Sequence, residues 1–190
     1  MLHIEDDAAI ARVLARALRS SGIIVDLVTT LSATREALLT HGPGHFDAAL
    51  LDLALPDGNG LELLPTLRDQ QIPVLVVSGH YPTQAPEVIS ANVFGVAKSL
   101  PTELLVRMIR GLLARVKFLD KCFGEQYGLS DKKVEVIRWG ARHLSAADAA
   151  KHMNCSVRTV ETYWQRVFKK VGGKRDRRPI LAAYLRFHGA

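Results

Sequence analysis

The sequence predicts a doubly wound α/β domain, built on a five-stranded parallel sheet, followed by a small all-α domain of four helices. Two observations predict the first domain. Short apolar runs alternate with helical segments, and two of these runs end in carboxylates. A third observation separates the second domain. Residues 1–116 carry 9 Lys+Arg and 12 Asp+Glu, a net charge of −3, whereas residues 117–190 carry 16 and 7, a net of +9, and the whole chain is +6.

The chain opens with a short apolar strand over residues 2–4, which ends in the carboxylates of Glu5, Asp6 and Asp7. An amphipathic helix follows, and Ser20, Ser21 and Gly22 end it. Its apolar face comprises Ile10, Val13, Leu14, Ala17 and Leu18. The alternative interpretation of the acids is that they only begin this helix, where the helix dipole favours them.

A second carboxylate, Asp52, ends another apolar strand, residues 48–51, and a Pro-Asp-Gly-Asn-Gly loop follows at 56–60. In the flavodoxin-like strand order 2-1-3-4-5, strands 1 and 3 flank the switch point, and ligands bind at their carboxyl ends. Glu5, Asp6 and Asp52 are therefore expected to converge. Each like-charge pair costs about 3 to 4 kcal/mol at about 4 to 5 Å, so a cation is needed, and oxygen ligands suit Mg²⁺.

Two further strands also end in polar side chains. The run 73–77 is followed by Ser78, and the run 93–97 is followed by Lys98. Ser78 is alternatively a simple turn residue before Gly79, and Lys98 an ordinary exposed lysine. Between them, residues 81–92 contain Pro82 and Pro86, so the helix expected there should be short or irregular.

Residues 1–115 resemble a response-regulator receiver domain. The matching pieces are Ile4-Glu5-Asp6-Asp7, the segment from Leu50 to Leu64, residues 74–78, and Lys98. The resemblance implies that Asp52 accepts a phosphoryl group from a sensor histidine kinase. It also implies that Glu5, Asp6, Asp52 and the backbone carbonyl of Ala54 hold Mg²⁺. Ser78 takes the switch position of the family, and Lys98 takes the phosphate-binding position.

The sequence departs from the receiver pattern near Lys98. Ser99 follows the lysine where the family usually has proline, and Pro101 comes two positions later. Gly95 stands where the family usually carries an aromatic residue coupled to the switch, with Phe94 one step away. These departures leave the phosphorylation chemistry intact and put its route to the signalling face in question.

The second half predicts a helix-turn-helix. Ser130 caps a helix that runs to about His143, and Ser145 caps a short helix in which Asp148 resembles a capping box. After a tight turn, Ser156 caps a longer helix that ends at Val171 before Gly172 and Gly173. The buried stripe of the longer helix comprises Val160, Trp164, Val167 and Val171. Both tryptophans are interpreted as core residues.

Residues 129–188 resemble the four-helix DNA-binding domain of the LuxR/NarL class, through Leu129-Ser130, Val136-Ile137, Leu144-Ser145, Ser156-x-x-Thr159-Val160-Glu161-x-Tyr163 and Lys169-Lys170-Val171-Gly172. The family usually has histidine at Tyr163, and Asp148-Ala149 also departs from its pattern. By resemblance, Glu161, Thr162 and Gln165 read bases. Arg158, Thr159, Arg166 and Lys170 contact phosphates, and Lys169 lies on the same face. The alternative is a solvated polar face.

Two helices offer dimer contacts. The first runs from Pro101 into the linker, and its apolar spacing is that of a coiled-coil seam: Leu105, Ile109, Leu112, Val116, Leu119 and Phe123. Alternatively, its first half packs on the sheet of its own domain. The last segment, 179–188, presents Ile180, Leu181, Tyr184 and Leu185. A homodimer would bind a two-fold symmetric site on double-stranded DNA. The expected domains are 1–115, a helical linker at 116–128, and 129–190.

Composition narrows the function classes. No apolar stretch reaches the length of a membrane span. The first strand begins at residue 2, so no signal peptide is expected. The two cysteines lie far apart in the sequence and indicate no disulfide framework. The sequence thus indicates a cytoplasmic two-component transcription regulator with no membrane partner. One rival is a phosphorylation-independent interaction module with a vestigial acidic site. A second rival is a phosphoaspartyl phosphatase. Because this sequence offers no second acid placed as a general acid, no enzyme activity is expected.

Overall fold

The structure is a computed structural model that describes residues 1–79, 94–171 and 175–188. Its contacts divide the chain into two compact units, Met1–Leu113 and Ala114–Ala190. Each unit has its own buried core. The irregular helix expected at 81–92 lies outside the described residues. Among the helices that are described, none combines the length and the apolar composition that crossing a membrane requires.

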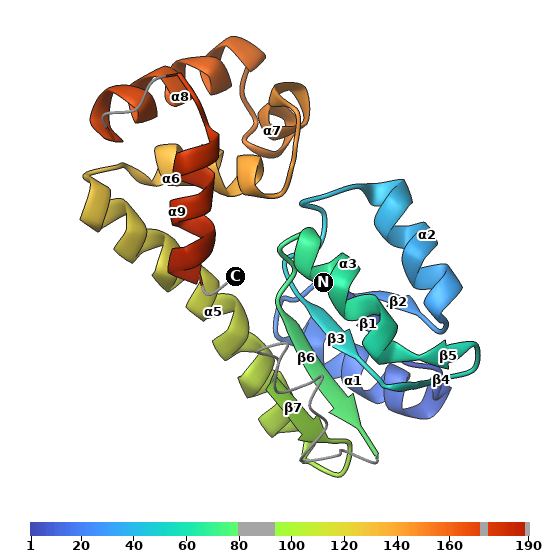
Figure 1. Cartoon of the computed structure of the whole chain (residues 1–190). Coiled ribbons are helices and arrows are strands. Elements are labelled where there is room, and N and C mark those ends of the chain that lie inside the picture. The colour runs from blue at the N-terminus through green and yellow to red at the C-terminus, as the bar shows by residue number, and fades with distance from the viewer. Residues whose placement is uncertain (80–93, 172–174, 189–190) are drawn as a thin grey trace. The chain divides into compact units, whose positions relative to one another are not determined.

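The first unit contains the expected parallel sheet (Figure 1). Within the described residues, its five strands lie in the order β2-β1-β3-β6-β7, which matches the predicted order 2-1-3-4-5 once the short β4 and β5 are set aside. The strands are β1 (Leu2–Ile4), β2 (Asp26–Val28), β3 (Ala49–Leu51), β6 (Val74–Ser78) and β7 (Phe94–Ala97). The residues of β1, β3 and β6 are all buried, and all of them except His3 and Ser78 are apolar, as is typical of strands covered on both faces.

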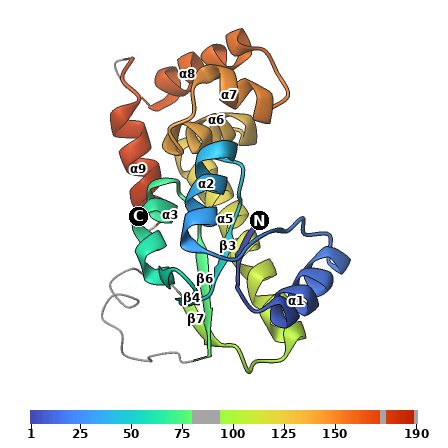
Figure 2. The ribbon, with the colours of Figure 1, turned by 90° about the vertical axis from the view of Figure 1, so that its right-hand side faces the viewer.

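Helices cover both faces of the sheet (Figure 2). On one face, α2 (Leu31–His41) and α3 (Leu64–Asp69) bury Leu38 and Leu67 against Leu2 and Ile4. On the other face, α1 (Ala8–Ser20) and α5 (Thr102–Tyr127) pack against Leu50 and Leu75.

The predicted inner face of α1 needs one correction. Val13 is 59% exposed, whereas Leu14 and Leu18 are buried as expected. Ala11 and Ala15 complete the buried face. The buried face of α1 therefore includes two alanines in place of Val13, and their small side chains let the helix lie close to the sheet.

The loop after Asp52 is more ordered than its Pro-Asp-Gly-Asn-Gly sequence predicts. Strands β4 (Ala54–Leu55) and β5 (Gly58–Asn59) pair as a short antiparallel hairpin, and the 3₁₀ helix η1 (Gly60–Leu63) leads into α3. A Cβ built on Gly60 would lie 2.1 Å from the carbonyl oxygen of Asp52. The glycine therefore lets the returning loop touch the backbone of the acidic residue.

Helix α5 runs from the first unit into the second without interruption, as predicted for the helix that begins near Pro101. Leu105 and Ile109 are buried in the core of the first unit, and Phe123 is buried in the core of the second. The alternative to the coiled-coil seam is thus confirmed for the first half of this helix. The predicted domain boundaries themselves stay a prediction.

The second unit is all helical, with α6 (Asp131–Ala141), α7 (Ala146–His152), α8 (Val157–Val171) and α9 (Arg178–His188). Ser145 accepts a hydrogen bond from the Asp148 amide at 3.1 Å, as the capping prediction requires. Ser130 precedes α6 but makes no side-chain capping bond, and α6 ends at Ala141 rather than near His143. The start of this helix is instead favoured by Asp131 in its first turn.

The core of the second unit confirms most of the predicted stripe on α8. Val160, Trp164 and Val167 are buried, whereas Val171 is only partly buried at the end of the helix. Both tryptophans belong to this core. Ile180 and Tyr184 of α9 are also buried there, so these two side chains serve the fold of one chain and are not free for a dimer contact.

One polar link crosses this core. The Tyr184 hydroxyl donates to Asp120 of α5 at 2.6 Å, and Arg138 of α6 lies 3.2 Å from the other carboxylate oxygen. Burial and the Asp120 charge raise the pKa of Tyr184 well above its ordinary value. The phenol therefore stays a hydrogen-bond donor, and the link joins three helices of the unit.

Candidate functional site

The parallel register brings four sequence-predicted residues to one edge of the sheet. Ile4 pairs with Leu51, and Leu51 pairs with Val76, so the residues that follow these strands extend from the same edge. Glu5 and Asp52 directly follow β1 and β3, Ser78 ends β6, and Lys98 directly follows β7. Glu5, Asp52 and Ser78 are each no more than 3% exposed. The edge thus carries buried polar groups, as expected for a ligand site at the switch point.

Lys98 joins the two buried carboxylates. Its ammonium nitrogen lies 2.7 Å from Asp52 Oδ2 and 2.8 Å from Glu5 Oε1. Asp52 Oδ1 accepts a longer bond, 3.3 Å, from the Ala54 amide, and Glu5 Oε1 also accepts from the Asp7 amide at 3.1 Å. Lys98 is therefore not an ordinary exposed lysine, because its side chain is 16% exposed and bonded to both acids.

The pKa values of this cluster reflect competition between burial and charge. Burial raises the pKa of Glu5 and outweighs the opposing hydrogen bond from Lys98. Burial alone would lower the pKa of Lys98, but the hydrogen bonds and charges of Asp52 and Glu5 prevail and raise it. The lysine consequently remains protonated at neutral pH and supplies the charge that the acids need.

A third acid completes the group. Asp6 is exposed, and oxygen atoms of Glu5, Asp6 and Asp52 all lie within 4.8 Å of one another. The oxygens of an octahedral Mg²⁺ site lie about 2.0 to 2.1 Å from the ion. The three carboxylate oxygens, no more than 4.8 Å apart, lie close to the spacing that one such ion requires, and the exposure of Asp6 leaves that side open to water. The donor set, all oxygen, fits Mg²⁺.

The contacts say less about the roles of the two remaining predicted residues, Ser78 and Ala54. Ser78 is buried, and its carbonyl accepts a hydrogen bond from the Lys98 amide at 3.0 Å. Ala54 is an exposed residue of β4. The switch role of the Ser78 hydroxyl and the metal-binding role of the Ala54 carbonyl stay predictions.

The structure gives defined surroundings to two further polar residues of the first unit that sequence reasoning did not single out. Asp57, on the turn between β4 and β5, accepts from the amides of Leu31 and Ser32 at 2.7 and 2.9 Å and so caps α2. The hydrogen bonds from the amides of Ser32 and Leu31 and from the Ser32 hydroxyl lower the pKa of Asp57. His3 of β1 is 1% exposed, and burial, assisted by the charge of Lys98, lowers its pKa to about 4.

The second unit presents the polar face that was expected on α8. The exposed members of the predicted DNA-contacting set are Arg158, Glu161, Gln165, Arg166, Lys169 and Lys170. Thr159 and Thr162 are half-buried, and the Thr162 hydroxyl donates to the Arg158 carbonyl at 2.8 Å. Lys170 donates to the carbonyl of Gly128, so its ammonium also joins α8 to the residue that follows α5.

Comparison with known families matches both units. The model of the response regulator receiver domain matches residues 1–110, and the model of the bacterial regulatory proteins of the luxR family matches residues 128–181. The first match covers more than half of the chain.

The individual proteins that resemble this chain are regulatory proteins. The transcriptional regulatory protein FixJ of Azorhizobium caulinodans is 28% identical over 181 residues, which cover 88% of this chain and 83% of FixJ. The regulatory protein RegA of Rhodobacter capsulatus is 33% identical over 42% of this chain and 43% of RegA. BasR of Escherichia coli is 31% identical over 60% of this chain and 52% of BasR. The chain thus spans about half the length of the last two.

Solved structures resemble the first unit. A two-component response regulator from Clostridium difficile superposes with a TM-score of 0.55 at 21% identity, covering 60% of this chain and 95% of that structure. A CheY-like receiver domain from Methylobacillus flagellatus gives a TM-score of 0.51 at 27% identity, covering 58% and 95%. With the strand order and the two family matches, these similarities show that the chain belongs to the response regulators that join a receiver domain to a LuxR-family DNA-binding domain.

Proposed function

We propose that this chain is a phosphorylation-regulated, DNA-binding transcription regulator of a two-component system, with Asp52 as the phosphoryl acceptor. The family is one of regulatory domains and not of enzymes. The observation that carries the proposal is the Asp52 carboxylate, buried at the edge of the sheet, bonded to Lys98 and close to two further acids.

The chemical step is an in-line transfer. An Asp52 carboxylate oxygen attacks the phosphorus of a phosphohistidine on the sensor kinase, and the new P–O bond forms as the P–N bond breaks. The electron pair of the broken bond stays on the imidazole nitrogen of the kinase. Oδ1 is the better placed oxygen for attack, because its 3.3 Å bond to the Ala54 amide is weaker than the 2.7 Å ion pair of Oδ2.

Lys98 and Ser78 are proposed to bind the product. The Lys98 ammonium, which already pairs with Asp52, is placed to pair with phosphoryl oxygens after transfer. Ser78 ends the neighbouring strand, and its hydroxyl is proposed as the group that donates to the phosphoryl group and reports its presence.

The acidic residues are proposed to hold Mg²⁺. Glu5, Asp6 and Asp52 would supply carboxylate oxygens, and Ala54 its backbone carbonyl. When bound, the ion offsets the negative charge that accumulates on the transferring group. Lys98 supplies one positive charge beside three acids, which supports a further cation at this edge.

Helix α8 is proposed to enter the major groove of double-stranded DNA. Gln165, Glu161 and Thr162 would read base edges, and Arg158, Thr159, Arg166, Lys169 and Lys170 would contact phosphates. The net charge of +9 over residues 117–190 supports this assignment. A homodimer that reads two half-sites with two-fold symmetry is the proposed binding form.

A phosphorylation-independent module is the competing function, because Ser99 and Gly95 replace the proline and the aromatic residue that the family usually carries. The two functions differ in their response to beryllofluoride, a mimic of the phosphoryl group. Regulation by phosphorylation predicts that beryllofluoride with Mg²⁺ binds and changes the solution mass or the DNA affinity. An unchanged mass and DNA affinity at saturating beryllofluoride would favour the module.

The acceptor is tested by labelling. Acetyl phosphate with Mg²⁺ should phosphorylate the wild-type chain once, and Asp52→Asn should abolish the label, because an amide is not a nucleophile toward phosphorus. Asp69→Asn, an exposed acid at the end of α3, should label like the wild type. Mass spectrometry of the intact protein measures the result. Persistent labelling of Asp52→Asn at another residue would contradict the assignment.

A further inference from the structure

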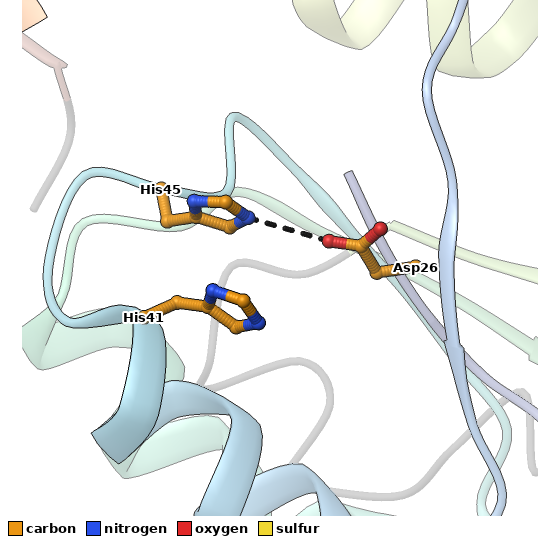
Figure 3. A group of neighbouring side chains, drawn as sticks. All are labelled: Asp26, His41 and His45. Atoms are coloured by element: carbon orange, nitrogen blue, oxygen red, sulfur yellow. Dashed lines mark hydrogen bonds and ion pairs between the residues drawn. The ribbon is translucent and has the colours of Figure 1, made fainter.

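A second group of metal-ligating side chains lies in the first unit, away from the acidic edge. It comprises Asp26 at the start of β2, His41 at the end of α2, and His45 in the loop that follows (Figure 3). One ligand atom from each lies within 4.8 Å of the other two. His45 Nε2 is 3.3 Å from Asp26 Oδ2, and the two imidazole rings point their outer nitrogens toward the aspartate.

This group is separate from the proposed phosphorylation site. Asp26 pairs with Leu2, the first residue of β1, whereas Glu5 and Asp52 follow the last residues of β1 and β3. In a parallel sheet, the first and the last residues of the strands lie at opposite edges. Occupation of one site therefore leaves the ligands of the other untouched.

The two imidazoles are held in place before any ligand arrives. Their rings stack with centroids 4.1 Å apart and planes 15° apart. The ring of Phe46, which is 1% exposed, meets both edge-on, at 5.7 Å from His41 and 4.7 Å from His45. Chain geometry also favours the pair, because the intervening turn contains Gly42 and Gly44 with φ of 70° and 90°. The ligands thus lose little further freedom on binding a metal.

The donor set selects the kind of metal. Two imidazole nitrogens and one carboxylate suit a borderline transition-metal ion and are a poor set for Mg²⁺, which prefers oxygen. The His-x₃-His spacing of residues 41 and 45 is one that occurs in zinc sites. Ligands of a tetrahedral zinc lie about 2.0 to 2.1 Å from the ion and hence about 3.3 Å apart. The ligand atoms lie no more than 4.8 Å apart, so they exceed that spacing by at most about 1.5 Å. Both histidines are exposed to solvent.

We propose that Asp26, His41 and His45 form a binding site for a divalent transition-metal ion, with Zn²⁺ as the ion of best fit and water in the remaining coordination position. Bound there, the ion ties the end of α2 and its following loop to the edge strand β2. Asp26 also interacts with the positive charge of the amino terminus, on which Asp47 acts as well. The amino terminus is already bonded to the Ile24 carbonyl at 2.8 Å.

The test is a calorimetric titration of the full chain, prepared without a polyhistidine tag, with ZnCl₂. Excess Mg²⁺ in the buffer keeps the oxygen-only acidic site from competing. We expect one equivalent of Zn²⁺ to bind, and His41→Gln, His45→Gln and Asp26→Asn each to weaken it at least about tenfold. Zn²⁺ should also raise the melting temperature of the wild type and not that of His41→Gln. Circular dichroism checks that each variant is folded.

Two controls locate the ion. His143→Asn removes another exposed histidine, at a residue whose φ of 59° asparagine tolerates, and Asp52→Asn alters the acidic edge. Both should bind Zn²⁺ like the wild type. Substituting Co²⁺ should give visible d–d absorption without the thiolate charge-transfer bands that Cys122 or Cys155 would produce. Equal binding by wild type and all three ligand variants, thiolate bands, or no binding at all would overturn the proposal.

Discussion

At the scale of single residues, the charge balance of the acidic edge depends on Lys98. Glu5 and Asp52 have side chains 3% and 1% exposed, and the lysine contacts both within 2.8 Å. Buried carboxylates are costly unless they are paired, and removing one partner of a buried ion pair costs more than the pair itself contributes. Lys98 is therefore expected to stabilise the first unit as well as to serve in phosphorylation.

Replacing Lys98 should show how much its charge contributes to the stability of the first unit. Lys98→Met keeps most of the aliphatic chain and removes the charge, and we expect it to lower the free energy of unfolding by about 3 kcal/mol at pH 7. The loss should shrink as pH falls, because protonation of Glu5, whose pKa is already raised by burial, relieves the unpaired charge. Urea denaturation measures this. Lys121→Met, at an exposed residue of α5, is the control, and an equal loss there would refute the expectation.

His3 gives the first unit a pH dependence of its own. Its side chain is buried in β1, and burial lowers its pKa from 6.5 to about 4. The unfolded chain therefore binds a proton on this imidazole at a pH where the folded chain does not. The contribution of the neutral imidazole to the free energy of unfolding is fully present above about pH 6.5 and is lost as the pH falls toward 4.

A matched pair of proteins isolates this contribution. Between pH 7 and pH 4 the wild type should lose about 3 kcal/mol of unfolding free energy that His3→Leu does not lose, since each pKa unit corresponds to about 1.4 kcal/mol. Acidic groups shared by both proteins cancel in the difference. Parallel stability curves for the two proteins across this pH range would show that His3 is not the titrating group.

At the scale of the elements, the loop that follows Asp52 depends on one glycine. The returning chain at Gly60 approaches the Asp52 carbonyl so closely that a methyl group would lie 2.1 Å from it. The adjoining Asp57 caps α2 across 26 residues of sequence. The loop thus couples the backbone of the candidate acceptor to the start of a helix on one face of the sheet.

Two glycine substitutions should have opposite effects. Gly60→Ala should displace the loop, destabilise the first unit and slow acetyl-phosphate labelling of Asp52, because backbone atoms cannot yield as a side chain can. Gly111→Ala lies in α5, where a Cβ meets nothing within 4 Å, and should stabilise the helix by about 0.5 to 1 kcal/mol. Thermal melts and labelling rates test both. Normal labelling by a folded Gly60→Ala would contradict the loop's role.

At the scale of the whole molecule, the opposite charges of the two halves bear on DNA binding. The basic half carries a net charge of +9 and the acidic half −3. Phosphate contacts release counterions, so each one adds to the salt dependence of the affinity. Arg166 is a cleaner probe of such a contact than Lys170, whose ammonium is also bonded to the Gly128 carbonyl.

Substitutions on α8 should therefore fall into two kinds. Arg166→Ala should weaken all DNA sequences about equally and reduce the salt slope by about 1, whereas Gln165→Ala should change sequence preference more than overall affinity. Lys121→Ala removes the same charge from α5 and serves as the control. Fluorescence anisotropy at several salt concentrations measures both quantities. An unchanged preference in Gln165→Ala would mean that another face of the helix reads the bases.

Helix α5 shows where sequence reasoning meets its limit. Its apolar spacing fits both a coiled-coil seam and a helix packed on its own domain, because both need an apolar residue every three or four positions. The structure buries Leu105 and Ile109 in one core and Phe123 in another. The periodicity predicted the helix and its length, and only packing decided which surface each residue covers.

The sequence by itself determined the parallel sheet, the helical second unit and the convergence of Glu5, Asp6 and Asp52. These follow from local rules, since an apolar strand that ends in an acid places that acid at the carboxyl edge. Tertiary structure alone decided that Lys98 bridges two acids, that Asp57 caps α2, and that Asp26 meets His41 and His45. The partners in each case lie 15 to 93 residues apart, and no local periodicity encodes a contact over such separations.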